Sequence, residues 1–339
     1  MKRVRVEDAV GMVLAYDLTK IVPGIFKGAA FKKGYVIKAE DIEELKNMGK
    51  YHIQAIDLSE RDVHENDAAA RIAHAAASKA AVVCAAVEGK ANIKAGSSGI
   101  LKINVKALEE ANELGKAVLV TLHDNTLVEE GKIVAAAKII PLTIEDELVK
   151  RIENICARNM PMIDIKPISC LKTGILVTGS EVYYGRIQDK FGDKLRDKVN
   201  HYGGQVLDIR YAPDEADFIV GEIKGLMESG AEVVLISGGM AVDADDVTPK
   251  AIERVASEVV TYGVPLLPGS MCMLAYAGSI PLIGVPACAM FSKTTILDII
   301  YPRILTKERV GKADLLSLAH GGMCLNCETC SYPVCPFGK

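Results

Sequence analysis

The sequence predicts a mixed α/β protein whose second half is a doubly wound, mostly parallel sheet. From residue 172 onward, short apolar runs rich in β-branched residues alternate with amphipathic segments of helical period. Each apolar run leads into a loop that contains Gly, Pro, Ser, Thr or Asp, as is typical of the carboxyl ends of parallel strands. The first half carries many short β-prone runs separated by Gly and Pro, which predicts a β-rich α+β fold. A cysteine-rich tail follows.

Length and composition limit the possible classes of protein. A chain of 339 residues is too long for one ordinary core. The net charge of -4 gives no electrostatic footprint for nucleic acid. No apolar stretch matches a membrane span of roughly 20 residues, and no apolar segment of a secretory signal follows the basic N-terminus. We therefore expect a cytoplasmic protein that binds neither nucleic acid nor membranes. The expected divisions are a small β-rich domain at 1–58, an α+β middle domain at 59–165, an α/β domain at 170–310 and the tail at 311–339.

The elements of the first half follow from local composition. Gly and Pro separate its β-prone runs, and an alanine-rich run from residue 68 favours helix. The expected elements are strands within 11–18, 31–37 and 52–58, a short helix at 40–45 that Gly49 ends, a helix from 68, a strand at 81–84, a β-rich segment at 88–142, a helix at 143–157 and a linker at 159–167.

The elements of the second half follow from periodicity. Ile187, Phe191, Leu195 and Val199 recur every four residues and predict one face of a helix. The apolar run 232–236 predicts a fully buried central strand. The other expected elements are strands at 175–177, 205–209 and 280–285, and helices at 215–227, 249–257 and 291–305.

The loop after the central strand is the first candidate site. It begins with Ser237, Gly238 and Gly239 and then carries three aspartates, Asp243, Asp245 and Asp246, within four positions. A glycine turn before a helix start presents backbone N–H groups to an anion. Carboxylates beside an anion require a hard cation between them. The loop therefore predicts a phosphorylated ligand with Mg²⁺.

Similar loops follow the other strands of this half. In a doubly wound sheet all of them converge on one crevice at the carboxyl ends of the strands. Taken singly, Asp214 also fits a helix N-cap and Thr178-Gly179 an ordinary turn. The loops are Thr178 to Glu181, Asp214, Pro268 to Ser270, and Pro286 with Ala287.

These loops, in this order, resemble the molybdopterin-binding domain shared by molybdopterin adenylyltransferases and molybdopterin molybdotransferases, over residues 170–310. The resemblance implies that Asp214 and Asp246 are catalytic and hold Mg²⁺ together with ATP or molybdate. It also implies pairing into a homo-oligomer and delivery to a recipient molybdoenzyme. The residues implied in binding molybdopterin are Thr178, Gly179, Ser180, Glu181, Ser237, Gly238, Gly239, Met240, Asp243, Pro268, Gly269, Ser270, Pro286 and Ala287.

The chain departs from the family pattern at three places. Ser180 stands where the family carries Asp, Met240-Ala241 stands where it carries Thr followed by Gly or Ser, and Ala287 replaces a glycine. Two functions follow from the resemblance. The first is Mg-dependent adenylylation of molybdopterin or insertion of molybdate, and the alternative is a non-catalytic carrier or sensor of the cofactor. An unrelated phosphosugar or nucleotide enzyme on the same fold is a third possibility, because fold does not fix function.

The tail is a separate candidate site. Cys324, Cys327, Cys330 and Cys335 precede Pro336 with the spacing C-x2-C-x2-C-x4-C-P. Bacterial ferredoxins use C-x2-C-x2-C-x3-C-P, and four thiolates also satisfy tetrahedral zinc. The tail therefore predicts an iron-sulfur cluster or zinc, and the alternative is a disordered tail with reduced cysteines.

Overall fold

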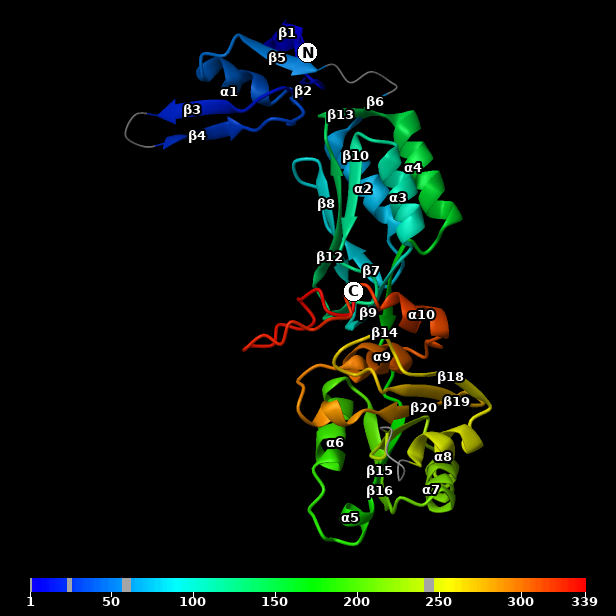
Figure 1. Ribbon diagram of the computed structural model, residues 1–339. Helices are drawn as coiled ribbons and strands as arrows, with labels where there is room; N and C mark the ends of the chain where they lie inside the picture. The colour runs from blue at the N-terminus through cyan, green and yellow to red at the C-terminus, as the bar shows by residue number, and fades with distance from the viewer. Residues whose placement is uncertain (1, 23–25, 57–61, 241–246) are drawn as a thin grey trace. The chain divides into compact units, whose positions relative to one another are not determined.

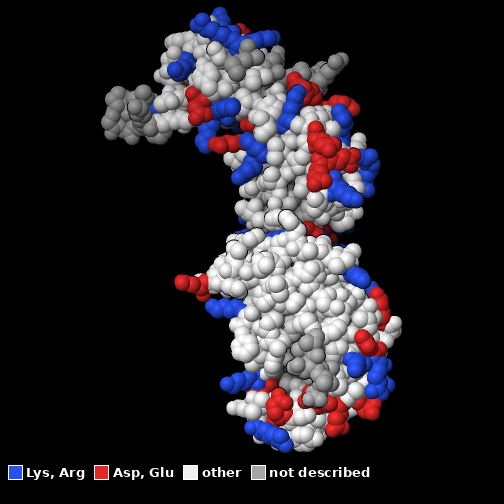
Figure 2. All heavy atoms as spheres, in the orientation of Figure 1, with Lys and Arg blue, Asp and Glu red and all other residues white. Residues whose placement is uncertain are grey.

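The computed structural model describes residues 2–22, 26–56, 62–240 and 247–339. The chain divides into two compact units, Met1–Lys166 and Pro167–Lys339. Acidic and basic side chains are intermixed on the visible surface of the first unit, whereas in the second unit they lie mainly along the edges and the lower end, as Figure 2 shows. No helix in the described ranges has the length and apolar character that crossing a bilayer requires.

The first unit begins with a small antiparallel sheet and a hairpin. The sheet has the order β1-β5-β2, and β3 pairs with β4 (Figure 1). The short helix and the strand after it are confirmed, and Gly49 follows the helix with a φ of 73°, the left-handed conformation that ends helices. Residues 57 and 58 of the expected strand lie outside the described residues. The bounds are β1 (Lys2–Arg5), η1 (Val6–Asp8), β2 (Val13–Leu14), β3 (Leu18–Val22), β4 (Phe26–Phe31), α1 (Asp41–Asn47) and β5 (His52–Ile56).

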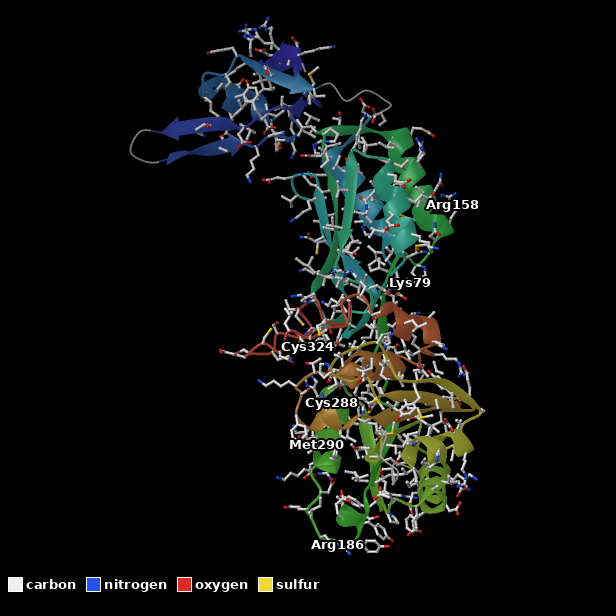
Figure 3. The ribbon with its side chains drawn as sticks, in the orientation of Figure 1. Lys79, Arg158, Arg186, Cys288, Met290 and Cys324 are labelled. Carbon is white, nitrogen blue, oxygen red and sulfur yellow. The ribbon has the colours of Figure 1, made fainter. Side chains whose placement is uncertain are left out.

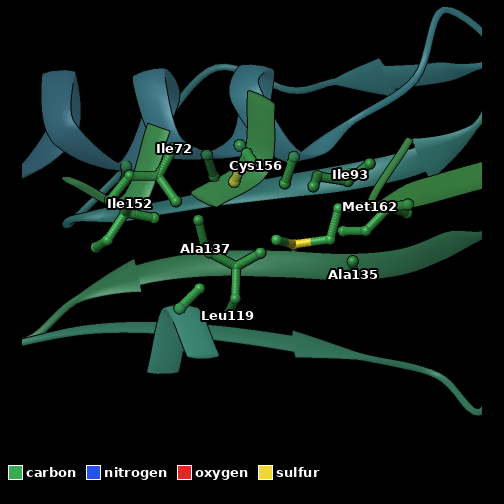
Figure 4. Close-up of a cluster of buried hydrophobic side chains, with 14 of the residues drawn as sticks. Ile72, Ile93, Leu119, Ala135, Ala137, Ile152, Cys156 and Met162 are labelled. Atoms are coloured by element: carbon green, nitrogen blue, oxygen red, sulfur yellow. The ribbon is translucent and has the colours of Figure 1, made fainter. Parts of the chain in front are cut away.

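The rest of this unit packs three helices against a four-stranded antiparallel sheet of order β10-β12-β8-β7. Figure 4 shows the core, where Ile72 and Ile152 from two helices meet strand residues such as Ala137. Two expectations were wrong: Thr143–Glu145 is a strand rather than helix, and the supposed linker contains a strand with Ile163 and Ile165 buried. The bounds are β6 (Asp62–His64), α2 (Glu65–Ala76), β7 (Ala81–Val83), β8 (Lys90–Ala95), β9 (Gly99–Ile103), α3 (Val105–Glu113), β10 (Ala117–Thr121), β11 (Leu127–Val128), β12 (Ile133–Ile139), β13 (Thr143–Glu145), α4 (Asp146–Arg158) and β14 (Ile163–Pro167).

Glu65, the first residue of α2, is only 5% exposed, and its carboxylate occupies space next to the backbone of Gly34 and Gly89. Burial raises the pKa of Glu65 above its ordinary value. The folded state therefore binds this proton more tightly than the unfolded state, and stability falls as pH rises from about 4.3 through the raised pKa. We expect Glu65→Gln to lessen that fall, measured by urea unfolding between about pH 4 and pH 8. Glu109→Gln, an exposed change on α3, should leave the pH profile unaltered, and an equal change in both variants would contradict the assignment.

The second unit is the predicted doubly wound sheet. Its order is β16-β15-β17-β20-β19-β18, in which the first four strands are parallel and β19 is antiparallel to both neighbours. The predicted fold class is thus confirmed. The bounds are β15 (Lys172–Thr178), α5 (Ser180–Tyr183), α6 (Phe191–His201), β16 (Gln205–Ala212), α7 (Ala216–Glu228), β17 (Val233–Ser237), α8 (Thr248–Val255), β18 (Glu258–Tyr262), β19 (Met273–Ala277), β20 (Ile280–Val285), η2 (Ala287–Met290), α9 (Ile296–Leu305) and α10 (Lys312–Ser317).

Helices cover both faces of this sheet, with α6 on one side and α7 and α8 on the other (Figure 1). Adjacent residues of β15 face opposite ways, as the period of two in a strand requires. The Thr173 hydroxyl lies 2.7 Å from the hydroxyl of Tyr301 on α9, whereas Gly174 lies against Leu226 of α7. The central strand is buried on both sides, which explains why its sequence is apolar without alternation.

Two expected helix starts were wrong by several residues. Asp189 accepts hydrogen bonds from the backbone of Phe191 and Gly192, so α6 begins at Phe191 and leaves Ile187 exposed. A capping box of Thr295 and Asp298 begins α9 at Ile296 rather than at residue 291. In both places a side chain that satisfies the first N–H groups fixes the boundary.

The end of α9 carries a buried cation. The Arg303 side chain is 3% exposed, and its Nη2 lies 2.6 Å from Glu308 and 2.7 Å from Asp314 of α10. An unpaired guanidinium is costly to bury, and these two carboxylates offset that cost. This cluster attaches α10 to the sheet domain.

Candidate functional site

The register of the sheet brings four predicted loops to one edge. Thr178, the last residue of β15, pairs with Ala212, the last residue of β16. Val177 pairs with Ser237, and Ser237 pairs with Val285, so β17 and β20 end at the same level. The loops that follow these strands therefore start side by side, as the sequence predicted.

The turn after β17 is a cluster of backbone donors. Gly238 and Gly239 have φ of 103° and 54°, both in the left-handed region. Among the described residues none accepts a hydrogen bond from the backbone N–H groups of Gly238, Gly239 or Met240. Successive N–H groups in such a turn form an anion-binding nest. Ser237 adds a fully buried hydroxyl that has no hydrogen-bond partner in the described part of the chain.

Thr178 ties this turn to the neighbouring strand and helix. Its Oγ1 donates to the carbonyl of Ser237 at 3.3 Å and lies 3.1 Å from the Thr248 hydroxyl on α8. A Cβ on Gly238 would collide with the carbonyl oxygen of Thr178 and would lie 2.6 Å from its hydroxyl. Thr178 is thus a buried support for the turn, and only glycine fits at 238.

Ser180 and Asp214 bind each other. The Ser180 N–H donates to Oδ2 of Asp214 at 2.8 Å, and the Asp214 N–H donates to the Ser180 hydroxyl at 3.1 Å. This reciprocal pair joins the loops after β15 and β16. Asp214 Oδ1 has no hydrogen-bond partner among the described residues and is the oxygen that remains for a cation. Gly179, with φ of 145°, allows the tight entry into α5.

A pocket of 430 Å³ opens beside the β17 turn. It collects most of the predicted ligand-binding residues, but Thr178 to Glu181, Ser237 and Asp214 do not line it. The predicted Asp243, Asp245 and Asp246 lie outside the described residues. The predicted residues that line the pocket are Gly238, Gly239, Met240, Pro268, Gly269, Ser270, Pro286 and Ala287.

The pocket also has walls that the sequence did not predict. Phe191, Leu267, Met271 and Cys288 line it, and the Tyr262 hydroxyl donates to the Met240 carbonyl at 2.9 Å. Most of these additions belong to the β18–β19 hairpin and its loop, which were not expected as strands. The β-prone run 258–262 was the available signal.

Met240 has a packing role in addition to its place at the pocket. It is 4% exposed, and its Cε lies 2.5 Å from where a Cβ on Gly284 would stand. Its side chain fills the core between the sheet and α8. The departure from the family pattern at this position is therefore accommodated by the glycine in β20.

Two thiols near the pocket are held neutral. Burial raises the pKa of Cys272 to about 12 and also raises the pKa of Cys288, which Figure 3 labels on η2. Since thiolate is the reactive form, neither is a nucleophile near neutral pH. In the described ranges no group of three or more His, Cys, Asp or Glu side chains is arranged to hold a metal ion.

Most of the second unit matches a known protein family. Residues 174–306 match the family described as probable molybdopterin binding domain. This stretch is a member of that family. Residues 3–57 match a domain of unknown function (DUF8806). The molybdopterin-binding domain spans β15 to α9, and its candidate site is the strand-end edge described above.

Relatives share only parts of the chain. A CinA-like protein of Mycobacterium tuberculosis is 31% identical over 83 residues, which are 24% of this chain and 19% of that protein. The chain thus spans about a fifth of the length of the curated relatives that it matches. The molybdopterin biosynthesis enzyme MoaB from Thermus thermophilus is 19% identical with a TM-score of 0.35, and the match covers 41% of this chain and 98% of that one. The tungsten cofactor synthesizing protein MoaB from Pyrococcus furiosus is 14% identical with a TM-score of 0.33, with the same coverage.

Proposed function

We propose that the molybdopterin-binding domain holds the phosphate of molybdopterin on the turn of Gly238 to Met240 and the pterin in the adjoining 430 Å³ pocket. The observation that carries the proposal is the set of three N–H groups without acceptors among the described residues, next to two left-handed glycines. The dianionic phosphate matches these donors, and the largely apolar pocket matches a flat ring system. Membership in the family supports the choice of ligand.

In the enzymatic function that we propose, Asp214 and Asp246 would hold Mg²⁺. In adenylylation, an oxygen of the molybdopterin phosphate bonds to the α-phosphorus of ATP, and the bond to the β-phosphate oxygen breaks as pyrophosphate leaves. Such transfers are catalysed by positioning and by charge neutralisation. Molybdate insertion would use the same carboxylates to orient a second anion. Oδ1 of Asp214 is available for this role, because only Oδ2 accepts the hydrogen bond from the Ser180 N–H.

A carrier or sensor is the second candidate, and the Ser180–Asp214 pair favours it. Ser180 supplies no carboxylate, and both its N–H and its hydroxyl are engaged with Asp214. The edge therefore has fewer charges to organise a cation than the family pattern implies. In this form the domain would bind molybdopterin and pass it to a recipient molybdoenzyme without turnover.

Calorimetric binding of molybdopterin, with and without Mg²⁺ and ATP or molybdate, tests the proposal. Asp214→Asn is the informative variant, because an amide oxygen still accepts the bond from Ser180 while the charge is lost. We expect adenylylation or molybdate insertion to fall by about 100-fold or more, with Mg-free binding unchanged. Asp214→Ala, which also removes the acceptor, should weaken Mg-free binding as well.

Each outcome has a clear meaning. Tight binding without product in the wild-type protein would select the carrier. Full turnover by Asp214→Asn would refute the role of the carboxylate. Absence of binding would overturn the proposal as a whole.

A further inference from the structure

The tail after α10 is folded without regular secondary structure. Residues 319–339 contain neither helix nor strand, although they are held to the unit at several points. The Leu267 N–H donates to the Gly322 carbonyl at 2.8 Å, and the Cys324 N–H donates to the Leu267 carbonyl at 2.9 Å. The Tyr332 hydroxyl donates to the carbonyl of Asp298 at 3.1 Å, and Phe337 is 3% exposed. Irregular segments of this length are uncommon in compact domains and are usually either functional or linker segments.

All four tail cysteines line one pocket of 280 Å³. Figure 3 labels the first of them, Cys324. Every cysteine of the tail is a free thiol; Cys327 and Cys330 are exposed, and Cys324 and Cys335 are half-buried. The fold has therefore gathered four thiols from twelve residues of chain around one concavity.

Apolar packing of Phe337 anchors the end of the tail but does not account for the gathering of the four cysteines. Within the tail, Leu325 is 72% exposed and Val334 is 85% exposed. A segment whose large apolar side chains face solvent gains little from burial. Soft thiolates, by contrast, are ligands for zinc and for iron-sulfur clusters.

We propose that Cys324, Cys327, Cys330 and Cys335 together bind one thiolate-ligated metal centre, either a zinc ion or an iron-sulfur cluster. The fixed backbone at Cys324 and the buried Phe337 anchor the two ends of the segment. As described, the four thiols line this pocket without yet forming a metal-binding group of three or more. Binding therefore requires the residues between the two anchors to bring the sulfur atoms together around the metal. The centre does not depend on molybdopterin binding.

The metal centre would brace one wall of the molybdopterin pocket. The backbone of Leu267 is hydrogen-bonded to the tail, and Leu267 also lines the 430 Å³ pocket. Pro268 lines both this pocket and the 280 Å³ pocket of the tail cysteines. Ordering the tail therefore also holds this loop in place.

Metal analysis of the full chain, purified without oxygen, is the first test. We expect about one zinc, or about four iron with four sulfide, per chain. For zinc, exchange with Co²⁺ should give the absorption of a tetrahedral thiolate site; for a cluster, the protein itself should be coloured. Either metal supports the proposal, and absence of a stoichiometric metal would overturn it. Absence of metal would not show whether molybdopterin binds, because calorimetric titration with molybdopterin tests that separately, so the two proposals can fail independently.

Single Cys→Ser changes locate the ligands. Cys327→Ser and Cys330→Ser should each lose most of the bound metal, since both thiols are exposed and neither supports a core. Cys170→Ser, an exposed cysteine outside the tail, should retain it. Full metal retention in the tail variants, or equal loss in Cys170→Ser, would overturn the assignment. Hydrogen exchange of residues 319–339 in wild-type protein, with and without a chelator, should show loss of protection when the metal is removed.

Discussion

Replacing Gly238 with Ala is expected to lower the free energy of unfolding by about 2–5 kcal/mol and to abolish molybdopterin binding. The φ of 103° is itself unfavourable for a residue with a Cβ. The new methyl group would in addition collide with the carbonyl of Thr178, so β15 and β17 would have to separate. Denaturant unfolding and calorimetric titration with molybdopterin measure the two effects.

Gly230→Ala is the matched control. Gly230 also has a left-handed φ, 96°, but a Cβ there would meet no atom of the described residues within 4 Å. We expect a cost of about 1–2 kcal/mol from the backbone alone, and unchanged binding. Equal costs for the two variants would show that the close approach to Thr178 contributes nothing.

Arg303→Met is expected to cost about 3–5 kcal/mol, the second large effect. Arg303 is buried between α9 and α10, and its loss would leave Glu308 and Asp314 without their shared cation. Thermal and denaturant unfolding should show the loss, with α10 released first in hydrogen exchange.

Arg309→Met tests whether burial is the reason. Arg309 is 53% exposed, pairs with the equally exposed Glu258 and lies 4.0 Å above the ring of Tyr276. An exposed pair with a cation–π contact contributes about 1 kcal/mol. If this variant were as unstable as Arg303→Met, burial of the ion pair would not be the deciding factor.

The parallel part of the sheet could be predicted because its signal is local. The apolar run at β17 and the turn residues after each strand are all visible in the sequence. The β18–β19 hairpin was missed because an alternation of strands and helices predicts parallel strands and gives no signal for an antiparallel hairpin. As a result, Leu267 and Met271 were absent from the predicted site.

The hydrogen-bonded pair of Ser180 and Asp214 could not be predicted from the sequence either. Ser180 and Asp214 are 34 residues apart, and their two hydrogen bonds depend on the register of β15 against β16. The sequence predicts that a carboxylate lies at the strand-end edge of the sheet, but it does not predict whether one of the carboxylate oxygens already accepts a hydrogen bond. The same holds for Met240, whose burial depends on the absence of a side chain at Gly284.

The pairing of the tail with Leu267 affects how the protein can be dissected. A fragment ending after α10 would leave both backbone polar groups of Leu267 without their partners in the tail. It would also uncover the apolar surface of Ile299 on α9, against which Gly338 lies closely. Unpaired backbone groups beside exposed apolar surface favour association between copies. Such a fragment is therefore expected to aggregate more readily than one that begins at Pro167 and keeps the tail.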